Sequence, residues 1–226
     1  MLDKELFLYH HPLNPFCRKV RLTLLEKGFS VKLILERPWE RREGFLQKNP
    51  LGEIPVLVES DGVILSGHQA ICEYLNEIKT SPNLLGETPL GRAEIRRLTE
   101  WLDGAFFRDA VYPILLERVL KVIATHEAPD SNMIRAGREN LQKYIKYLDW
   151  LAARRAFLGG QRLSFADLSA AAHFSVLDYL GELNWQNSGD LALWYAKIKS
   201  RPTFVPLLSD KVVGIPPSAH YMNLDF

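Results

Sequence analysis

The pattern of strands and helices changes once along this chain of 226 residues, and that change limits the fold more than any other feature. In the first 80 or so residues, short apolar runs typical of strands alternate with amphipathic stretches typical of helices. Beyond about residue 89 the pattern is helical nearly to residue 209. We therefore predict a mixed α/β domain over residues 1–80, a linker over residues 81–88 and an all-helical domain over residues 89–209.

The first domain is expected to contain one small sheet covered by helices. Asp61-Gly62 between two apolar runs is a strong signal for a hairpin, and Pro15 suits the first turn of a helix. The resulting order, β-α-β-α-β-β-α, is the thioredoxin-type arrangement. We expect strands at residues 5–9, 31–35, 55–58 and 63–65, and helices at residues 15–27 and around Ala70 to Leu75.

The second domain is expected to be built around one buried helix. Ser164-Phe165-Ala166-Asp167 has the pattern of a capping box and precedes a mostly apolar stretch, residues 168–180. Amphipathic helices are expected at residues 91–122, 132–155 and 191–199, and a short one starting at Arg201-Pro202. The final stretch contains Pro216-Pro217 and little helical periodicity, so residues 210–226 are predicted to form an extended tail.

Composition excludes several classes of function. The chain has 28 Lys and Arg against 27 Asp and Glu, a balance that argues against a nucleic-acid partner. Since no apolar run approaches about 18 residues, we expect no membrane insertion. The first residues lack the apolar core of a secretory signal, and two cysteines, Cys17 and Cys72, suit a reducing compartment. We therefore expect a cytoplasmic protein.

Three motifs, in this order and spacing, resemble those of the glutathione S-transferase superfamily. Residues 14–21 stand where the family keeps its first-helix motif, residues 49–55 look like the loop that ends in its cis-proline, and residues 164–167 look like the cap of its buried helix. The resemblance covers essentially the whole chain. It implies a thioredoxin-like N-terminal domain followed by an all-helical transferase C-terminal domain.

The resemblance also places a thiol-activating site at the start of the first helix. The family usually has Ser or Cys before the proline of that motif, and here the residue is Asn14. Asn14 can donate an amide N–H to a sulfur but is not a nucleophile. Cys17 occupies the second cysteine position of a glutaredoxin-like motif. Both are weak catalytic candidates, and the alternative is that Cys17 is a partly buried residue with no catalytic role.

A glutathione-type pocket would also need a clamp for the γ-glutamyl end of the tripeptide. The family normally has an acid and a Ser there, whereas this chain has Gly67 and His68. Ile54 and Pro55 would still offer backbone to the cysteinyl part. Because losing a charge-assisted pair costs on the order of 2–3 kcal/mol, we expect glutathione binding to be weak or absent, and no cofactor.

A narrower resemblance points away from catalysis. Residues 38–42, 177–181, 199–202 and 214–226 look like features of the glutathione-transferase-like division proteins of α-proteobacteria, which bind the tubulin-like filament protein FtsZ. This resemblance implies a homodimeric, non-catalytic adaptor that joins FtsZ filaments during cell division. The alternative is an enzyme, a glutathione S-transferase or glutathione-dependent thiol transferase with a non-standard glutathione site.

Candidate partner-binding residues fall in three places. Trp39 lies among arginines, and Trp and Arg are enriched at interface hot spots, although Trp39 could instead pack onto the second helix. The tail could dock a partner or fold back over the second domain, and the helix around residues 116–119 is a third candidate. The residues are Trp39, Arg41, Arg42, Glu117, Arg118, Tyr221, Asp225 and Phe226.

Overall fold

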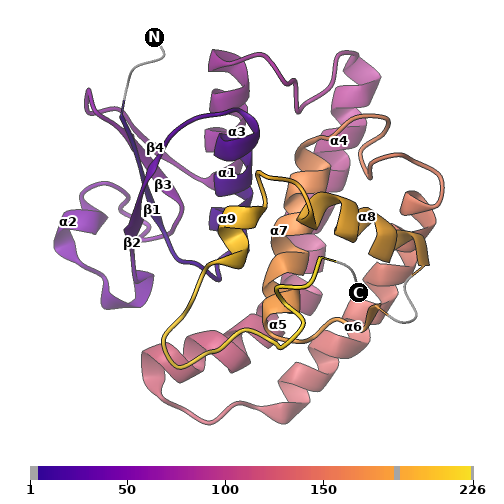
Figure 1. Ribbon diagram of the computed structural model, residues 1–226. Coiled ribbons are helices and arrows are strands. Elements are labelled where there is room, and N and C mark those ends of the chain that lie inside the picture. The colour runs from indigo at the N-terminus through magenta and orange to yellow at the C-terminus, as the bar shows by residue number, and fades with distance from the viewer. Residues whose placement is uncertain (1–4, 186–188, 225–226) are drawn as a thin grey trace. The chain divides into compact units, whose positions relative to one another are not determined.

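The computed structural model describes residues 5–185 and 189–224 and divides into two compact units between Asn83 and Leu84 (Figure 1). Strands occur in the first unit, while the second unit is formed by helices and the segments that join them. The predicted fold class, a thioredoxin-like part followed by a helical part, is therefore confirmed.

The first unit contains a four-stranded sheet with the strand order β2-β1-β3-β4. The pairing of β1 with β2 is parallel, and the pairings of β1 with β3 and of β3 with β4 are antiparallel. This order follows from one helical crossover and one hairpin. The strands are β1 (Leu6–His10), β2 (Lys32–Leu35), β3 (Val56–Glu59) and β4 (Ile64–Ser66).

Two helices of the first unit pack against each other, α1 (Pro15–Glu26) and α3 (His68–Ile78). Residues on one side of β1, Leu6 and Leu8, are buried, as the alternation of a half-covered strand requires. The segment between β2 and β3 forms two short helices, where the predicted order has one helix without assigned bounds. They are η1 (Pro38–Glu40), a 3₁₀ turn, and α2 (Glu43–Leu46).

Lys27, the residue after α1, ties that helix to the end of the unit. Its Nζ donates to Asn76 Oδ1 and to the carbonyl oxygen of Lys79, both at 2.7 Å, and to the carbonyl oxygen of Pro82. The side chain is 1% exposed. A cation this deeply buried is tolerated because all three of its donors have acceptors.

The second unit begins with one long helical stretch in which α-helical and π-helical turns follow each other. In the π-helical part Tyr112 N–H donates to Phe107 O, five residues earlier. Proline at position 113 has no N–H to give to this ladder, which favours irregular hydrogen bonding nearby. The segments are α4 (Pro89–Trp101), η2 (Leu102–Val111), α5 (Tyr112–Leu115) and η3 (Leu116–Thr125).

The rest of the second unit packs around one buried helix, α7 (Phe165–Tyr179), as its apolar sequence predicts. Every residue of α7 is buried, so this helix forms the centre of the unit (Figure 1). The other helices are α6 (Ser131–Ala152), α8 (Gly189–Lys199) and α9 (Val205–Leu208). The last of these begins four residues after Arg201, where a helix was expected to start.

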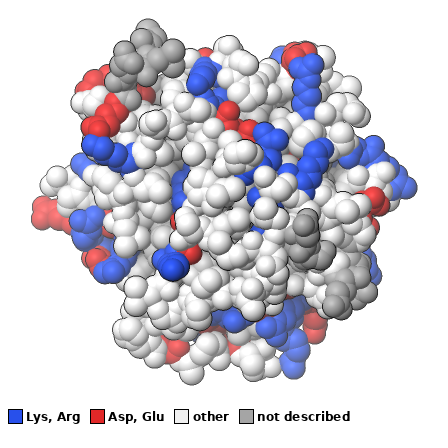
Figure 2. Space-filling model, viewed as in Figure 1, with Lys and Arg blue, Asp and Glu red and all other residues white. Residues whose placement is uncertain are grey.

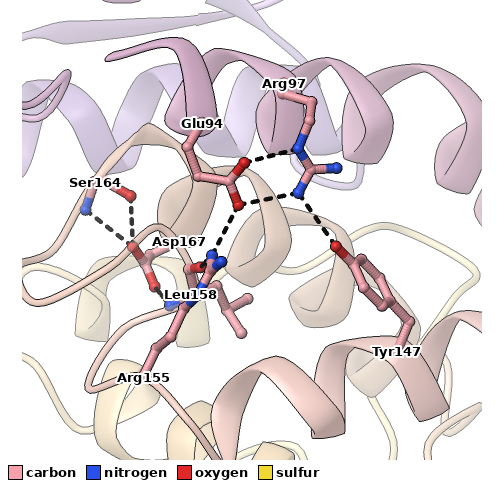
Figure 3. Close-up of polar contacts among 7 residues, drawn as sticks. All are labelled: Glu94, Arg97, Tyr147, Arg155, Leu158, Ser164 and Asp167. Atoms are coloured by element: carbon pink, nitrogen blue, oxygen red, sulfur yellow. Dashed lines mark hydrogen bonds and ion pairs between the residues drawn. The ribbon is translucent and has the colours of Figure 1, made fainter. Parts of the chain in front are cut away.

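The predicted capping box at the start of α7 is present, and its acid, Asp167, also accepts hydrogen bonds from outside the cap (Figure 3). Asp167 Oδ2 accepts from both Ser164 N–H, at 3.0 Å, and Ser164 Oγ, at 2.7 Å. Its Oδ1 accepts from Leu158 N–H at 2.7 Å and from Trp194 Nε1 at 3.0 Å. Burial raises the pKa of Asp167, and these four donors oppose that shift. The acid thus joins α7 to α8 and to the loop before α7.

A second polar network joins α4 to α6 (Figure 3). Glu94 accepts from Arg97 Nε at 2.7 Å and from Arg155 Nη1 at 2.9 Å. Arg97 Nη2 also donates to Tyr147 Oη at 3.2 Å. Pairing with Arg97, which has the largest effect, and with Arg155 lowers the pKa of Glu94 to about 2.

The C-terminal tail differs from the predicted extended form, because it folds back in turns onto the end of α7. Val212 and Ile215 form an isolated bridge, and Tyr179 Oη donates to Ile215 O at 2.7 Å. Ser218 N–H donates to Tyr179 O at 2.8 Å. Prolines 216 and 217 remove two N–H donors, so the tail pairs with side chains and carbonyls of α7 and not as a strand.

Candidate functional site

The start of α1 is where the fold would place thiol chemistry, and here it holds a helix cap. Asn14 Oδ1 accepts from the backbone N–H of Cys17 at 2.9 Å, which makes Asn14 the N-cap of α1. The Cys17 side chain is 0% exposed. Burial, the largest effect, raises the pKa of the Cys17 thiol to about 12, although a hydrogen bond to the His11 backbone and the charge of Arg21 oppose it. At neutral pH Cys17 is therefore a thiol and not a nucleophilic thiolate.

The loop before β3 contains Ile54 and Pro55, two of the residues predicted to line a glutathione-type pocket. The Ile54–Pro55 peptide bond is cis, as the sequence motif predicts. Asn49 Nδ2 donates to Glu53 O at 2.8 Å and holds the loop that leads to it. Pro55 is buried, whereas Ile54 is partly exposed. The backbone of Ile54 is thus the one part of the predicted glutathione-type pocket that has the expected form.

The start of α3 has neither an acid nor a hydroxyl at positions 67 and 68, where the resemblance implies a clamp for an amino-acid head group. Gly67, the N-cap, has φ +87° and no side chain that could pair with an ammonium group. The ring of His68 stacks on Phe16, with centroids 4.3 Å apart and planes 19° apart. Lys19 Nζ donates to Gln69 Oε1 at 2.9 Å. The residues at this position therefore do not fit the charged end of glutathione.

The segment after β2 presents the first group of predicted partner-binding residues. Trp39 is half-buried, and its ring meets His11 edge-on, with centroids 5.5 Å apart. Arg37 Nη1 pairs with Glu40 Oε1 at 3.0 Å. Trp39 therefore has a rigid support on one side and an accessible face on the other, which is typical of an anchor residue at an interface.

Arg41 and Arg42 lie in the same segment but have different surroundings. The guanidinium of Arg42 pairs with Glu36, a carboxylate that is 0% exposed, and Nε of Arg42 donates to Glu36 Oε1 at 3.2 Å. Arg41 is exposed and has φ +45°, in the left-handed region. Arg42 thus pairs with a buried acid, while Arg41 is exposed and its guanidinium lies close to Gly52. The buried acid Glu36 was not singled out in the sequence, where nothing distinguishes it from a surface glutamate.

Glu117, the next candidate, is engaged inside the second unit. Its carboxylate is 2% exposed, and Oε2 accepts from Asp130 N–H and from Lys121 Nζ, both at 2.8 Å. These contacts, the backbone hydrogen bond first, lower the pKa of Glu117. Glu117 therefore joins η3 to the residue that precedes α6.

Arg118 also contacts its own chain. Its Nη1 donates to Leu180 O at 2.7 Å and pairs with Glu182, which Arg138 Nε also contacts at 2.6 Å. The side chain of Arg118 is 37% exposed, so part of its guanidinium remains accessible. The structure places Arg118 at the end of α7, next to the residues that hold the tail.

Tyr221, a tail residue that the sequence predicts to contact a partner, is buried. Tyr221 is 0% exposed, its Oη donates to Leu207 O at 3.0 Å, and its ring meets that of Tyr179. Tyr221 therefore anchors the tail to its own unit. The exposed large apolar side chains of the described part of the tail are Val213, Met222 and Leu224, 96%, 59% and 38% exposed. Asp225 and Phe226 lie outside the described residues.

On the face seen in Figure 2, basic and acidic side chains of the described residues are interspersed among uncharged ones, so this face has no separate basic and acidic patches. Within residues 5–185 and 189–224, no three His, Cys, Asp or Glu side chains are grouped so that they could hold a metal ion. None of the helices in those ranges combines the length and apolar character that a membrane crossing requires.

Comparison with known proteins places these features in a family. Residues 8–83 match the model of the glutathione S-transferase N-terminal domain. The chain is 41% identical to FtsZ-localized protein A of Caulobacter vibrioides over 228 residues, covering all of both chains. The fold matches the structure of FzlA from C. crescentus with a TM-score of 0.95 at 41% identity, covering 98% of this chain and 100% of that one.

A second solved structure agrees. A glutathione S-transferase from Rhodospirillum rubrum has 46% sequence identity and a TM-score of 0.96, again covering 98% of this chain and 100% of that one. Both the sequence and the fold are thus shared along nearly the full length. The chain therefore belongs to the glutathione S-transferase superfamily, with FtsZ-localized protein A among its full-length relatives.

Proposed function

We propose that this protein binds FtsZ filaments as a non-catalytic adaptor in cell division. The relative that shares its whole length is named for its localisation with FtsZ, and a chain with 41% identity over that length supports a shared partner. The protein would then act in the cytoplasm, where FtsZ assembles.

The proposal that the protein is not catalytic rests on the residues at the start of α1. A thiol transferase that uses its own cysteine needs a thiolate, and Cys17 is a buried thiol whose pKa is raised to about 12. Stabilising the thiolate of glutathione instead needs a donor at position 14, where Asn14 offers an amide and not the usual hydroxyl or thiol. The start of α3 carries Gly67 and His68 in place of a charged clamp. These features weigh against the alternative function, a glutathione S-transferase or thiol transferase.

The surface around Trp39 is the first candidate for the FtsZ contact. It combines a half-buried indole, which can bury more area on binding, with the exposed cation of Arg41. We also propose that the protein works as a homodimer, because a particle with two copies of this surface could join two filaments. Light scattering coupled to gel filtration would test the dimer.

Cosedimentation with FtsZ polymers tests the function. The wild-type protein should pellet with FtsZ in the presence of GTP and stay in solution without FtsZ. Trp39→Ala should lower the pelleted fraction about tenfold or more at limiting concentration, as loss of a hot spot does. Wild-type protein that ignores the polymer would contradict the function.

A matched control separates the contact from a folding defect. Trp150, on α6, is 49% exposed, and Trp150→Ala makes the same change on the other unit. This variant should pellet as the wild type does, and both variants should melt within a few degrees of it. If Trp39→Ala pelleted normally, the binding surface would lie elsewhere while the function stood.

A further inference from the structure

A buried carboxylate lies where the tail returns to the end of α7 (Figure 1). Asp178, in the last turn of that helix, has a side chain that is 0% exposed. Its Oδ2 accepts from Lys199 Nζ at 2.8 Å and from Tyr195 Oη at 3.1 Å, both on α8. Its Oδ1 accepts no hydrogen bond from any residue in the described part of the chain. One oxygen of this acid is therefore left to face a group on another element.

That group is the ring of His220, in the tail. Its Nε2 lies 3.5 Å from Asp178 Oδ1 and is itself a buried atom that makes no hydrogen bond among the described residues. The His220 side chain as a whole is nevertheless 40% exposed. One ring nitrogen thus meets a buried carboxylate while the ring stays in contact with solvent, so the ring can exchange protons with water.

The protonation state of His220 decides how well this contact fits. A neutral imidazole carries one N–H, and when that proton is on Nδ1 the Nε2 atom presents a lone pair to an oxygen that can only accept. An imidazolium has an N–H on both nitrogens, so Nε2 becomes a donor and its charge strengthens the bond to a carboxylate. Histidine ordinarily changes its charge between pH 5 and 8. The contact should therefore strengthen as the pH falls through this range.

Other charged groups limit the size of this effect. Among the described residues Asp178 is the one carboxylate within 4 Å of a His220 ring nitrogen. Lys199, whose side chain is 0% exposed, already pairs with the other oxygen of Asp178 and offsets part of the attraction to a second cation. The next charged groups beyond the end of α7 are Glu182, Arg118 and Arg138, which pair with one another. We therefore expect a change of a fewfold in the docking equilibrium of the tail.

His220 lies between the contacts that hold the tail on α7. Ser218 N–H donates to Tyr179 O and Ser218 Oγ to Asp178 O, both at 2.8 Å. On the other side of His220, the buried ring of Tyr221 packs edge-on against that of Tyr179. A stronger or weaker contact at His220 therefore acts on the segment that carries both attachments.

We propose that His220 is a pH-sensitive latch, whose protonated ring holds the tail on α7 through Asp178 and whose neutral ring lets the tail open more often. Opening would uncover Tyr221 and the apolar end of α7. The inference goes beyond the proposed function, because it concerns the chain's own tail and does not depend on any partner.

Amide hydrogen exchange on the full-length, ¹⁵N-labelled protein tests the latch. The reporters are the amides of Val212 and Ser218, which donate to the hydroxyl and the carbonyl oxygen of Tyr179. After correction for the intrinsic pH dependence of exchange, their protection should be about threefold or more higher at about pH 5.5 than at about pH 8. The amide of Phe29, which donates to Leu24 O in the first unit, should show no such change. Equal protection of the reporters at the two pH values would overturn the proposal.

Two substitutions of the same residue separate charge from shape. His220→Gln cannot take up a proton and should give the lower protection of Val212 and Ser218 at both pH values. His220→Lys keeps a cation at both and should give the higher protection at both. Equal protection in the two variants, with both still folded, would overturn the proposal.

A matched histidine provides the control. His126 is exposed and lies in the same unit, and His126→Gln should keep the pH dependence of the wild type. If His126→Gln removed that dependence, or if His220→Gln retained it, the proposal would be wrong. Cosedimentation with FtsZ reports on the proposed function separately, since hydrogen exchange is measured without the polymer.

Discussion

The side-chain oxygen of Asn14 accepts a hydrogen bond from the backbone N–H of Cys17 at 2.9 Å. The residue that a related enzyme would use to activate a thiol therefore satisfies a free donor of the helix. Cys17 is itself buried, so this helix start has a capping acceptor and an inaccessible thiol. Two predictions follow from this arrangement, and the contacts of Lys27 and Glu94 give two more.

Asn14→Ala should destabilise the protein by about 1 kcal/mol, because a capping acceptor is lost while the N–H of Cys17 stays in place. Asn14→Asp keeps an acceptor beside the positive end of the helix dipole and should be at least as stable as the wild type. Urea unfolding of the three proteins measures the difference. Equal stability of Asn14→Ala and wild type would show that the cap is not significant.

Cys17 should resist alkylation in the folded protein. Its thiol is buried and its pKa is raised to about 12, so little thiolate is present or accessible at neutral pH. Iodoacetamide followed by mass spectrometry of peptides should find Cys17 unmodified in the native protein and modified in urea. Rapid native labelling of Cys17 would contradict the absence of thiol chemistry here and revive the enzymatic alternative.

Lys27→Met should destabilise the first unit by about 2 kcal/mol or more, because Asn76 and the carbonyls of Lys79 and Pro82 lose their donor. Lys79→Met is the control. The ammonium group of Lys79 lies 5.3 Å from the centre of the Phe29 ring and does not substitute for the contacts that Lys27 makes. Thermal unfolding compares the two. A larger loss in Lys79→Met would mean that the buried ammonium is not what holds this end of α1.

Glu94 should make the free energy of unfolding depend on pH in the acidic range. Its pKa falls from 4.5 to about 2 in the folded state, so its contribution is present above the unfolded value and is lost as pH falls from about 4.5 to about 2. Because the pair is partly exposed, this contribution should be about 1 kcal/mol. Glu94→Gln should flatten that part of the curve of unfolding free energy against pH. An unchanged slope would exclude Glu94 as its source.

Much of the fold could be predicted from local sequence signals. Asp61-Gly62 indicates the hairpin, Pro15 and Gly28 delimit α1, and Ser164 with Asp167 marks the start of α7. Each of these signals acts within a few residues, so no knowledge of distant contacts is needed. The fold class follows from their order along the chain.

Features that depend on distant partners could not be predicted. The tail was expected to be extended, with docking to a partner or folding back over the second domain left open, and the contacts of Tyr179 and Ser218, far apart in sequence, turn it back onto α7. Glu117 was proposed as a partner contact, whereas its carboxylate receives the N–H of Asp130. The π-helical turns were not predicted either. They arise from packing and a proline, and the spacing of apolar residues along the sequence gives no sign of them.

The measurement that tests the central claim most directly is cosedimentation of the wild-type protein with GTP-assembled FtsZ, with and without millimolar glutathione. The protein should pellet with the polymer to the same extent in both cases, because the contact does not use the glutathione-type pocket. Failure to pellet, together with calorimetric binding of glutathione to the same sample, would contradict the account.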